Sequence, residues 1–406
     1  MGSAANGQGD DARAIPRRFI AGDALRAIAA MSVLVFHAGV ATLLWKEGQA
    51  ALNGEPDPQQ FHPLFHFLSP EVVSLRAGIY IFFVLSGYLL SRPFLAAYLF
   101  DAPQPRIGRY FRNRALRIIP AFWVVFTVYL IWNHGADGSG LGGVLAVYAF
   151  AQNYHWTPVA ELLDQAWTLD IEVAFYILLP VAFFVAVHLR RRRSSPRTRL
   201  AWLLGVLVVA YVLSLVARHN AGNPADLTYT IADFLFAFIP GIALAAVEPF
   251  AAPRLHGAAV AKYWVWGALA LAVCLIAVFV SQPVSHYGLR SILISLGCGA
   301  LVASPLIYQW STGGCWRVLD NTVMHWLGER SYGIYLIHLG LMTHVLGHVG
   351  NHGLGVTFAM LLVGVTAATL VAADLLWRFV EHPALERRLP WRRSPRVAPE
   401  PVGTPS

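Results

Sequence analysis

The chain has 406 residues, of which 57% are hydrophobic and 13% are charged, and its formal net charge is +8. Soluble domains carry about 25% charged residues, so the composition argues against a soluble protein and indicates an all-α protein that crosses a membrane several times. Arginines supply most of the positive charge and cluster between apolar runs, which favours membrane topology over nucleic-acid binding as their explanation.

The chain is predicted to be one membrane domain with a polar tail at each end. Residues 1–18 are small and polar, and we expect them to be disordered. Residues 384–406 form a basic, proline-rich tail that is too polar to fold alone. Residues 19–383 form the membrane domain, and we expect its first apolar segment to be retained rather than cleaved as a signal peptide.

Ten apolar runs approach or exceed the ~20 residues that a helix needs to cross a bilayer. The expected spans are residues 19–45, 77–98, 114–133, 167–189, 200–217, 230–248, 262–281, 289–310, 326–347 and 354–379. A further apolar piece, GGVLAVYAFAQ at 142–152, would be about 16 Å long as a helix, which is half of a bilayer core.

The basic loops orient these spans, because positive charge favours the cytoplasmic side. Residues 101–117 hold five arginines, residues 190–199 hold six and residues 387–396 hold five. The first two loops must lie on one side of the membrane, so two crossings separate them and 142–152 is a re-entrant or interfacial helix. The prediction is a polytopic bundle of about ten transmembrane helices in the cell membrane, with both termini cytoplasmic.

The first span, GDALRAIAAMSVLVFH, carries Arg26 and His37 on either side of a run in which Ser32 is the one polar residue. Eleven residues make three helical turns plus roughly 20°, so both side chains share one face about 16 Å apart. An ionisable group within a span is costly and is a functional candidate by default. The alternative is an Asp23–Arg26 structural pair and a hydrogen-bonded core histidine.

The next two spans add polar candidates. The second span contains FFVLSGYLLSR, with Ser86 and Tyr88 near its middle, and the third begins YFRNRALRIIPAF, with Arg112, Arg114 and Arg117 at the cytoplasmic edge. The planar guanidinium fork suits phosphate oxygens, so these arginines could hold a polyanionic cofactor. The alternative is a positively charged membrane anchor.

Later spans contribute a carboxylate and a serine. The fourth span begins QAWTLDIEVAFYILLP, and we expect Glu172 to point inward and Asp170 to point toward the outer interface. The ninth span contains ERSYGIYLIH, with Ser331 at its inner end and His338 at mid-depth. Each of these residues has an alternative role in packing or capping. The three cysteines show no metal or disulfide spacing, so no metal site is expected.

Together these stretches resemble the acyltransferase-3 family of integral-membrane O-acyltransferases, from about residue 19 to 383. The resemblance rests on five ordered pieces: Arg26 and His37 with ten residues between them, FFVLSGY, RNRALRIIP, WTLDIEVAFY and SYGIYLIH. The chain departs from the family where GDALRAIA replaces a pattern closer to DGLRG, which leaves the role of Asp23 less secure. Because WTLDIE stands where WSLxxE is usual, Glu172 keeps its register.

The resemblance implies transfer of an acyl group, acetyl by default, from cytoplasmic acyl-CoA to a hydroxyl acceptor, with Arg26 and His37 as functional residues. It also implies a stand-alone version without the esterase-like domain that some members append. The acceptor could be a cell-surface glycan, a glycolipid or a natural product, and no oligomeric state is indicated.

The residues suggest how this chemistry would be divided among them. The cofactor phosphates would rest on Arg112, Arg114 and Arg117, and its thin arm would run toward His37. His37 would act as a general base on the acceptor hydroxyl or would itself be acylated and relay the group. Glu172 would support His37. Hydroxyls to bind the thioester or the oxyanion would come from Ser86, Tyr88 and Ser331.

A competing class is a transporter or lipid flippase, which would also bury arginine, histidine and glutamate along a polar path. A third class is a membrane-embedded sensor without chemistry. Release of free thiol from acyl-CoA in the presence of an acceptor distinguishes the enzyme from both.

Overall fold

The computed structural model describes residues 18–53, 77–133, 139–154, 158–189, 194–220, 229–282, 286–346 and 354–387. Every regular element within these ranges is a helix, as the composition predicts. The expectations for residues 1–17, for the loop 54–76 and for the tail 388–406 lie outside the described residues.

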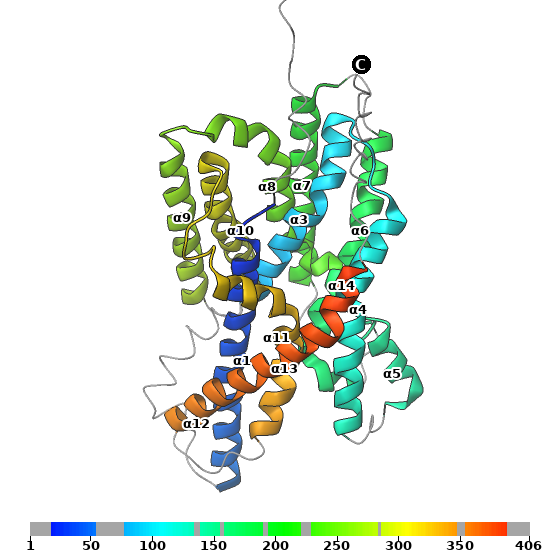
Figure 1. Cartoon of the computed structure of the whole chain (residues 1–406), viewed down its shortest axis with the longest axis vertical. Coiled ribbons are helices and arrows are strands. Elements are labelled where there is room, and N and C mark those ends of the chain that lie inside the picture. Colours follow the sequence, from blue (N-terminus) through cyan, green and yellow to red (C-terminus); the bar gives the residue numbers. More distant parts are fainter. Residues whose placement is uncertain are drawn as a thin grey trace, which may run out of the picture.

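Within the described ranges the chain forms ten long helical runs, whose arrangement Figure 1 shows. The first nine are α1 (Gly22–Asn53), α3 (Ala77–Phe100), α4 (Ile107–Trp132), α6 (Trp167–Leu189), α7 (Pro196–Asn220), α8 (Ile231–Leu255), α9 (Ala261–Ser281), α10 (Tyr287–Thr312) and α11 (Thr322–Leu346). The tenth run is continuous through α12 (Leu354–Met360), the π-helical segment Leu361–Val365, α13 (Thr366–Leu376), the π-helical segment Trp377–Glu381 and α14 (His382–Glu386).

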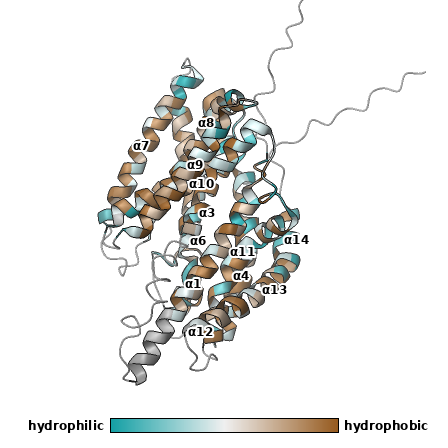
Figure 2. Cartoon of the chain, turned by 90° about the vertical axis from the view of Figure 1, so that its left-hand side faces the viewer, coloured by the Kyte–Doolittle hydropathy of each residue, from teal (hydrophilic) through white to brown (hydrophobic). Residues whose placement is uncertain are grey.

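Nine helical stretches within the described ranges are long and apolar enough to cross a membrane, so the chain is a multi-pass membrane protein. The remaining expected span, 326–347, lies in α11, which is 25 residues long but more polar. It carries Glu329 and Arg330 near one end and His338 within the bundle. Figure 2 shows hydrophobic residues along the length of α7 and hydrophilic ones at its ends, as expected for a helix that faces lipid.

Helix directions show that residues 142–152 do not form a span. The apolar piece forms α5 (Gly140–Tyr148), a helix of nine residues. Ser86 contacts Glu172 and Phe94 contacts Phe183, so α3 and α6 run in the same direction. Since α3 is followed by α4 before α6, an extra crossing at 142–152 would have made α3 and α6 antiparallel.

Glycines allow close approaches between helix backbones. On α11, a Cβ on Gly328 would clash with the backbone of Asp23 on α1, and on α8 a Cβ on Gly241 would clash with the backbone of Val84 on α3. Small residues of this kind let helix backbones pack closely within a membrane. Because Asp23 lies against Gly328 and His37 lies against His338, α1 and α11 run parallel, as expected for the first and ninth spans.

The last helical run crosses the bundle obliquely, over α1 and α11 toward α4 (Figure 1). An ion-pair cluster fixes it to α11: Arg330 Nε lies 2.6 Å from Asp374 Oδ1, and Arg378 Nε lies 2.7 Å from Asp374 Oδ2. The second π-helical segment places Glu381 against α4, where its carboxylate lies 3.7 Å from Arg117 Nη1. This run therefore covers one side of the polar interior.

Candidate active site

A cavity of about 110 Å³ lies between α1, α3, α4, α6 and α11. Six side chains singled out from the sequence line it: Arg26, Ser86, Arg114, Arg117, Glu172 and Ser331. Apart from Thr168, the rest of the wall is apolar or aromatic, with Phe82, Phe83 and Tyr332 among its members. Five separate helices thus bring together residues that lie up to 309 positions apart in the chain, from Arg26 to Tyr335.

Three guanidinium groups and one carboxylate dominate the charge of this cavity. The Oε1 atom of Glu172 accepts hydrogen bonds of 2.7 Å from the Ser86 hydroxyl and from the Tyr176 hydroxyl. The guanidinium of Arg114 lies over the ring of Tyr176, 5.9 Å from its centroid. The carboxylate of Glu172 therefore shares the cavity lining with the arginines. Because the lining holds three guanidinium groups and one carboxylate, its positive charge suits a phosphate or another anion.

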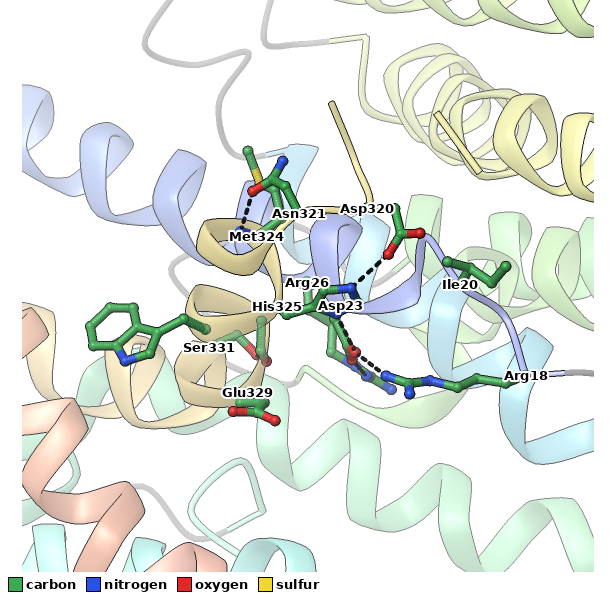
Figure 3. A network of polar contacts seen from close by, with 12 residues as sticks. Arg18, Ile20, Asp23, Arg26, Asp320, Asn321, Met324, His325, Glu329 and Ser331 are labelled. Atoms are coloured by element: carbon green, nitrogen blue, oxygen red, sulfur yellow. Dashed lines mark hydrogen bonds and ion pairs between the residues drawn. The ribbon is translucent and has the colours of Figure 1, made fainter. Parts of the chain in front are cut away.

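Arg26 connects the cavity to a polar network at the start of α1 (Figure 3). Asp23 Oδ1 accepts a 3.0 Å hydrogen bond from Arg26, and Asp23 Oδ2 accepts one of 2.8 Å from Arg18. His325 Nδ1 lies 3.3 Å from Asp23 Oδ2, and its Nε2 lies 2.8 Å from Asp320 Oδ1. These carboxylates raise the pKa of His325, the hydrogen bond to Asp320 being the largest cause.

His37 lies farther along α1 and pairs with a second histidine. Its Nδ1 lies 3.0 Å from Nε2 of His338 on α11, and also 3.0 Å from the backbone oxygen of Val33. His338 is fully buried, and its Nδ1 lies 3.1 Å from the backbone oxygen of Ile334. The ring of Tyr335, which lines the cavity, lies 5.9 Å from the His338 ring and so connects the two sites.

Two expected cofactor ligands lie away from the cavity lining. Tyr88 is buried beneath the guanidinium of Arg92, which lies 5.1 Å from its ring centroid, and its ring meets that of Phe19 edge-on. Arg112 is exposed and donates a 3.3 Å hydrogen bond to the backbone oxygen of Arg387. Asp170 is buried, and its Oδ2 accepts a 3.0 Å hydrogen bond from the backbone N–H of Asn153.

The sequence pattern of the acyltransferase-3 family, described as an acyltransferase domain, matches residues 20–378 of this chain. That range includes every residue of the cavity and both histidines of the pair. The chain belongs to the acyltransferase-3 family.

Several relatives of this acyltransferase-family chain are known by name. A peptidoglycan O-acetyltransferase of Listeria monocytogenes is 27% identical over 327 residues, covering 75% of this chain and 50% of the relative. A putative peptidoglycan O-acetyltransferase of Bacillus subtilis is 26% identical over 332 residues, with the same 75% and 50% coverage. A putative O-acetyltransferase of Staphylococcus aureus is 24% identical over 401 residues, covering 93% of this chain and 59% of the relative.

The chain thus spans about half the length of the first two relatives that it matches. No solved structure matches it. Within the part of this family member that the structure describes, no group of three or more histidine, cysteine or acidic side chains could hold a metal ion.

The structure adds three residues at or near the candidate site to which sequence reasoning assigned no role. Tyr176 lies four residues after Glu172, so helical spacing alone could have placed the two side chains on one face. His338 lies in the SYGIYLIH piece, but its partner is 301 positions away and no local pattern reveals the pairing. Glu381 lies in a π-helical segment, where a 3.6-residue period does not apply.

Proposed function

We propose that the protein transfers an acyl group, acetyl in the simplest case, from acyl-CoA to a hydroxyl group of a glycan. The family membership supports acyl transfer, and the names of its relatives support acetyl as the group and a cell-wall glycan as the acceptor class. The side of the membrane from which each substrate enters follows from the predicted topology, with acyl-CoA entering from the cytoplasm.

One observation carries this proposal. Arg26 from α1 and Arg114 and Arg117 from α4 converge on one cavity, and His37 stands eleven residues beyond Arg26 on the same helix. Helical rise makes that separation about 16 Å along α1, which is the scale of the arm that joins the phosphates of coenzyme A to its thiol. The arginines would bind phosphate oxygens, and the thioester would lie nearer to His37.

The size of the cavity limits what it can hold. Sites that enclose a whole cofactor measure roughly 300 Å³ or more, whereas this cavity measures about 110 Å³. It would therefore enclose a part of the donor, with the remainder at the cytoplasmic mouth. The apolar wall formed by Phe82, Phe83 and Leu85 suits the thin arm, and the arginines suit an anionic group.

In the proposed reaction His37 accepts the proton of the acceptor hydroxyl while that oxygen attacks the thioester carbonyl carbon. The carbon–sulfur bond then breaks, and the proton held by His37 passes to the departing thiolate. In the alternative, a nitrogen of His37 attacks the thioester carbon and the carbon–sulfur bond breaks, which leaves an acylated His37 and a thiolate. The acceptor oxygen then attacks the acyl carbon, the carbon–nitrogen bond breaks, and the hydroxyl proton ends on the thiol. The hydroxyls of Ser86 and Ser331 line the cavity, where they donate to Glu172 and to the backbone oxygen of Gly328. Each would turn from that acceptor to the developing oxyanion during transfer.

Glu172 has a supporting part in this scheme. Its carboxylate holds the hydroxyls of Ser86 and Tyr176 and faces the positive charges of Arg26 and Arg114. It would keep the arginine side chains ordered in the absence of substrate. Any effect of the Glu172 carboxylate on His37 would be electrostatic and would act across the cavity.

The test uses the purified full chain in lipid nanodiscs with acetyl-CoA and soluble glycan fragments. We expect free thiol to be released when an acceptor is present, and His37→Ala to abolish this release while its thermal unfolding stays close to that of the wild type. His344→Ala is the control, because His344 lies on α11 with its ring 4.6 Å from Trp132. A folded His37→Ala protein with full activity would contradict the scheme. Acceptor binding without any thiol release would favour transport.

A further inference from the structure

The two histidines form an ordered chain of polar contacts that ends on a backbone carbonyl of α11. His37 Nδ1 faces both His338 Nε2 and the Val33 carbonyl, each at 3.0 Å, and His338 Nδ1 faces the Ile334 carbonyl at 3.1 Å. We propose that His338 is a positioning residue that fixes the tautomer of His37 and directs its basic nitrogen toward the acceptor. This inference rests on the proposed acyl transfer.

The backbone carbonyls decide where the protons lie. A carbonyl oxygen can only accept a hydrogen bond, and a neutral imidazole has one N–H and one nitrogen lone pair. If His338 carries its proton on Nδ1, that proton meets the Ile334 oxygen and Nε2 presents a lone pair to His37. If His37 also carries its proton on Nδ1, that proton is shared between the Val33 oxygen and His338 Nε2, and each of the three contacts is a hydrogen bond.

The opposite arrangement is unfavourable on both helices. A proton on His338 Nε2 would point at His37 Nδ1, which would then need a lone pair. That lone pair would face the Val33 oxygen, and the lone pair on His338 Nδ1 would face the Ile334 oxygen. In this site, the free energy of two contacts between lone pairs is more unfavourable than that of one hydrogen bond is favourable. The geometry therefore favours the tautomer of His37 that carries its proton on Nδ1 and its lone pair on Nε2.

The surroundings of His338 hold it rigidly in this position. Its side chain is fully buried. Side chains from other elements bind the two carbonyls that precede it: Gln165 donates a 2.7 Å hydrogen bond to the Leu336 oxygen, and Tyr129 donates one of 2.7 Å to the Ile337 oxygen. A rigid partner limits rotation of the His37 ring, which keeps the base within reach of a bound hydroxyl.

This arrangement has a chemical consequence during transfer. When His37 Nε2 accepts the proton of the acceptor hydroxyl, the ring becomes an imidazolium and its Nδ1–H becomes a stronger donor. The lone pair of His338 Nε2 accepts this charge-assisted hydrogen bond without taking the proton. The carboxylate of a Ser–His–Asp triad holds its histidine in a comparable way, whereas here the partner is neutral and is oriented by a peptide carbonyl.

Two substitutions at His338 separate positioning from packing. In His338→Gln the side-chain amide can reach the place of Nε2 and offer its oxygen to His37. In His338→Asn the shorter amide reaches the place of Nδ1 and can donate to the Ile334 carbonyl. No acceptor then remains for the hydrogen bond from the Nδ1–H group of His37. Both side chains are polar and smaller than or similar to histidine, so a purely structural role would be impaired to a similar extent by each.

We expect His338→Asn to lower kcat by about 100-fold, the lower range of what a general base contributes, with the KM for acetyl-CoA unchanged. We expect His338→Gln to stay within about tenfold of the wild type, and His344→Gln on the same helix to be unaffected. Equal kcat values for the two His338 variants, in proteins with the same thermal unfolding, would overturn the inference. So would a change confined to KM.

A spectroscopic measurement keeps the inference testable should both variants unfold. In wild-type protein labelled with ¹⁵N-histidine, the resonances that His37→Ala removes should report a protonated Nδ1 and an unprotonated Nε2 at a pH where the ring is neutral. The reverse tautomer would overturn the inference and leave the acyl transfer itself intact. An inactive wild-type protein would instead refute the proposed function, because the tautomer measurement needs no turnover.

Discussion

At the scale of single residues, the arginines of the cavity differ in what surrounds them. Arg117 lies 3.7 Å from the buried Glu381 and 5.9 Å from the ring centroid of Tyr332, so it is held against the cavity wall. Arg112 on the same helix is exposed and bonds to a backbone oxygen. The two residues have the same charge and differ in position, which makes them a matched pair for substitution.

We expect Arg117→Gln to weaken acetyl-CoA binding by about 10- to 100-fold, because a hydrogen bond to a charged group contributes about 1.5–3 kcal/mol. Arg112→Gln should change the affinity by less than about threefold, since an exposed charge is screened. Titration calorimetry of the full chain in nanodiscs measures both. Equal losses for the two variants would mean that general positive charge at the membrane surface, rather than the cavity, binds the donor.

Protonation of His325 is expected to stabilise the contact between α1 and α11. The pKa of His325 is raised above its ordinary value by the hydrogen bond to Asp320 and by the contact with Asp23. A raised value means that folding favours the protonated ring, so this stabilisation is complete below about pH 6.5. It is lost as the pH rises through the raised pKa.

The corresponding measurement is thermal unfolding of detergent-solubilised protein between about pH 5 and pH 9. The wild type should lose stability relative to His325→Gln as the pH rises through this range, because the variant has no ring to deprotonate. Comparing the two proteins removes the contribution of other histidines. Parallel pH dependences would show that the network in Figure 3 does not respond to this proton.

Helical geometry explains why some of the expected site residues line the cavity and others do not. Positions two apart on a helix point about 160° away from each other. Ser86 and Tyr88, or Arg112 and Arg114, therefore cannot both face one cavity, and the sequence alone carried that information. The pairing of His37 with His338 could not be predicted in the same way. The helical period of a sequence shows which face of its own helix a residue occupies, but not which distant helix packs against that face.

At the scale of helices, the contact between α1 and α11 depends on Gly328. A Cβ at this position would meet the backbone of Asp23, which cannot move aside as a flexible side chain could. The contact sets both the Asp23–Arg26 pair and, ten residues farther along α11, the approach of His338 to His37. Packing at one residue therefore affects two parts of the site.

We expect Gly328→Ala to destabilise the protein by about 1–3 kcal/mol, the usual range for overpacking, and to lower transfer activity. Gly267→Ala on α9 is the control, because a Cβ there meets nothing within 4 Å; its higher helix propensity should make it neutral or stabilising by up to about 1 kcal/mol. Thermal unfolding in detergent measures both. A Gly328→Ala protein as stable as the control would mean that the two helices separate easily.

Hydropathy predicted the helices better than it predicted their ends. All ten expected spans correspond to helical runs, but α4 begins at Ile107 rather than 114 and α8 continues to Leu255 rather than 248. Arginines and prolines at these ends are unfavourable within lipid yet compatible with a helix that extends into the headgroup region. A hydropathy pattern reports the part of a helix that lies in the membrane, whereas hydrogen bonding decides where the helix stops.

At the scale of the whole molecule, the parallel directions of α3 and α6 and of α1 and α11 agree with ten crossings. The charged loops predict which side is cytoplasmic. Positive loops favour the inside, and three Lys or Arg residues (Lys46, Arg76 and Arg218) fall in segments assigned to the outside. Helix packing alone cannot orient the bundle relative to the membrane, because the same fold inserted upside down has identical internal contacts.

Cysteine labelling in intact cells tests this orientation. In a background in which the three native cysteines are replaced, we expect Gln104→Cys and Ser194→Cys to be protected from a membrane-impermeant maleimide, and Gln282→Cys to react with it. Permeabilising the cells should make all three positions react. Labelling of position 104 and position 282 from the same side would contradict the predicted topology.

The placement of Arg26 and His37 on one uninterrupted helix also restricts how the protein can change over evolutionary time. Adding or removing one residue between them would rotate His37 by about 100° relative to Arg26, away from its contact with His338. Substitutions in this stretch are therefore tolerable where length changes are not. A donor with a longer or shorter arm could be accommodated by altering the residues around Arg114 and Arg117, but not by moving the base along α1.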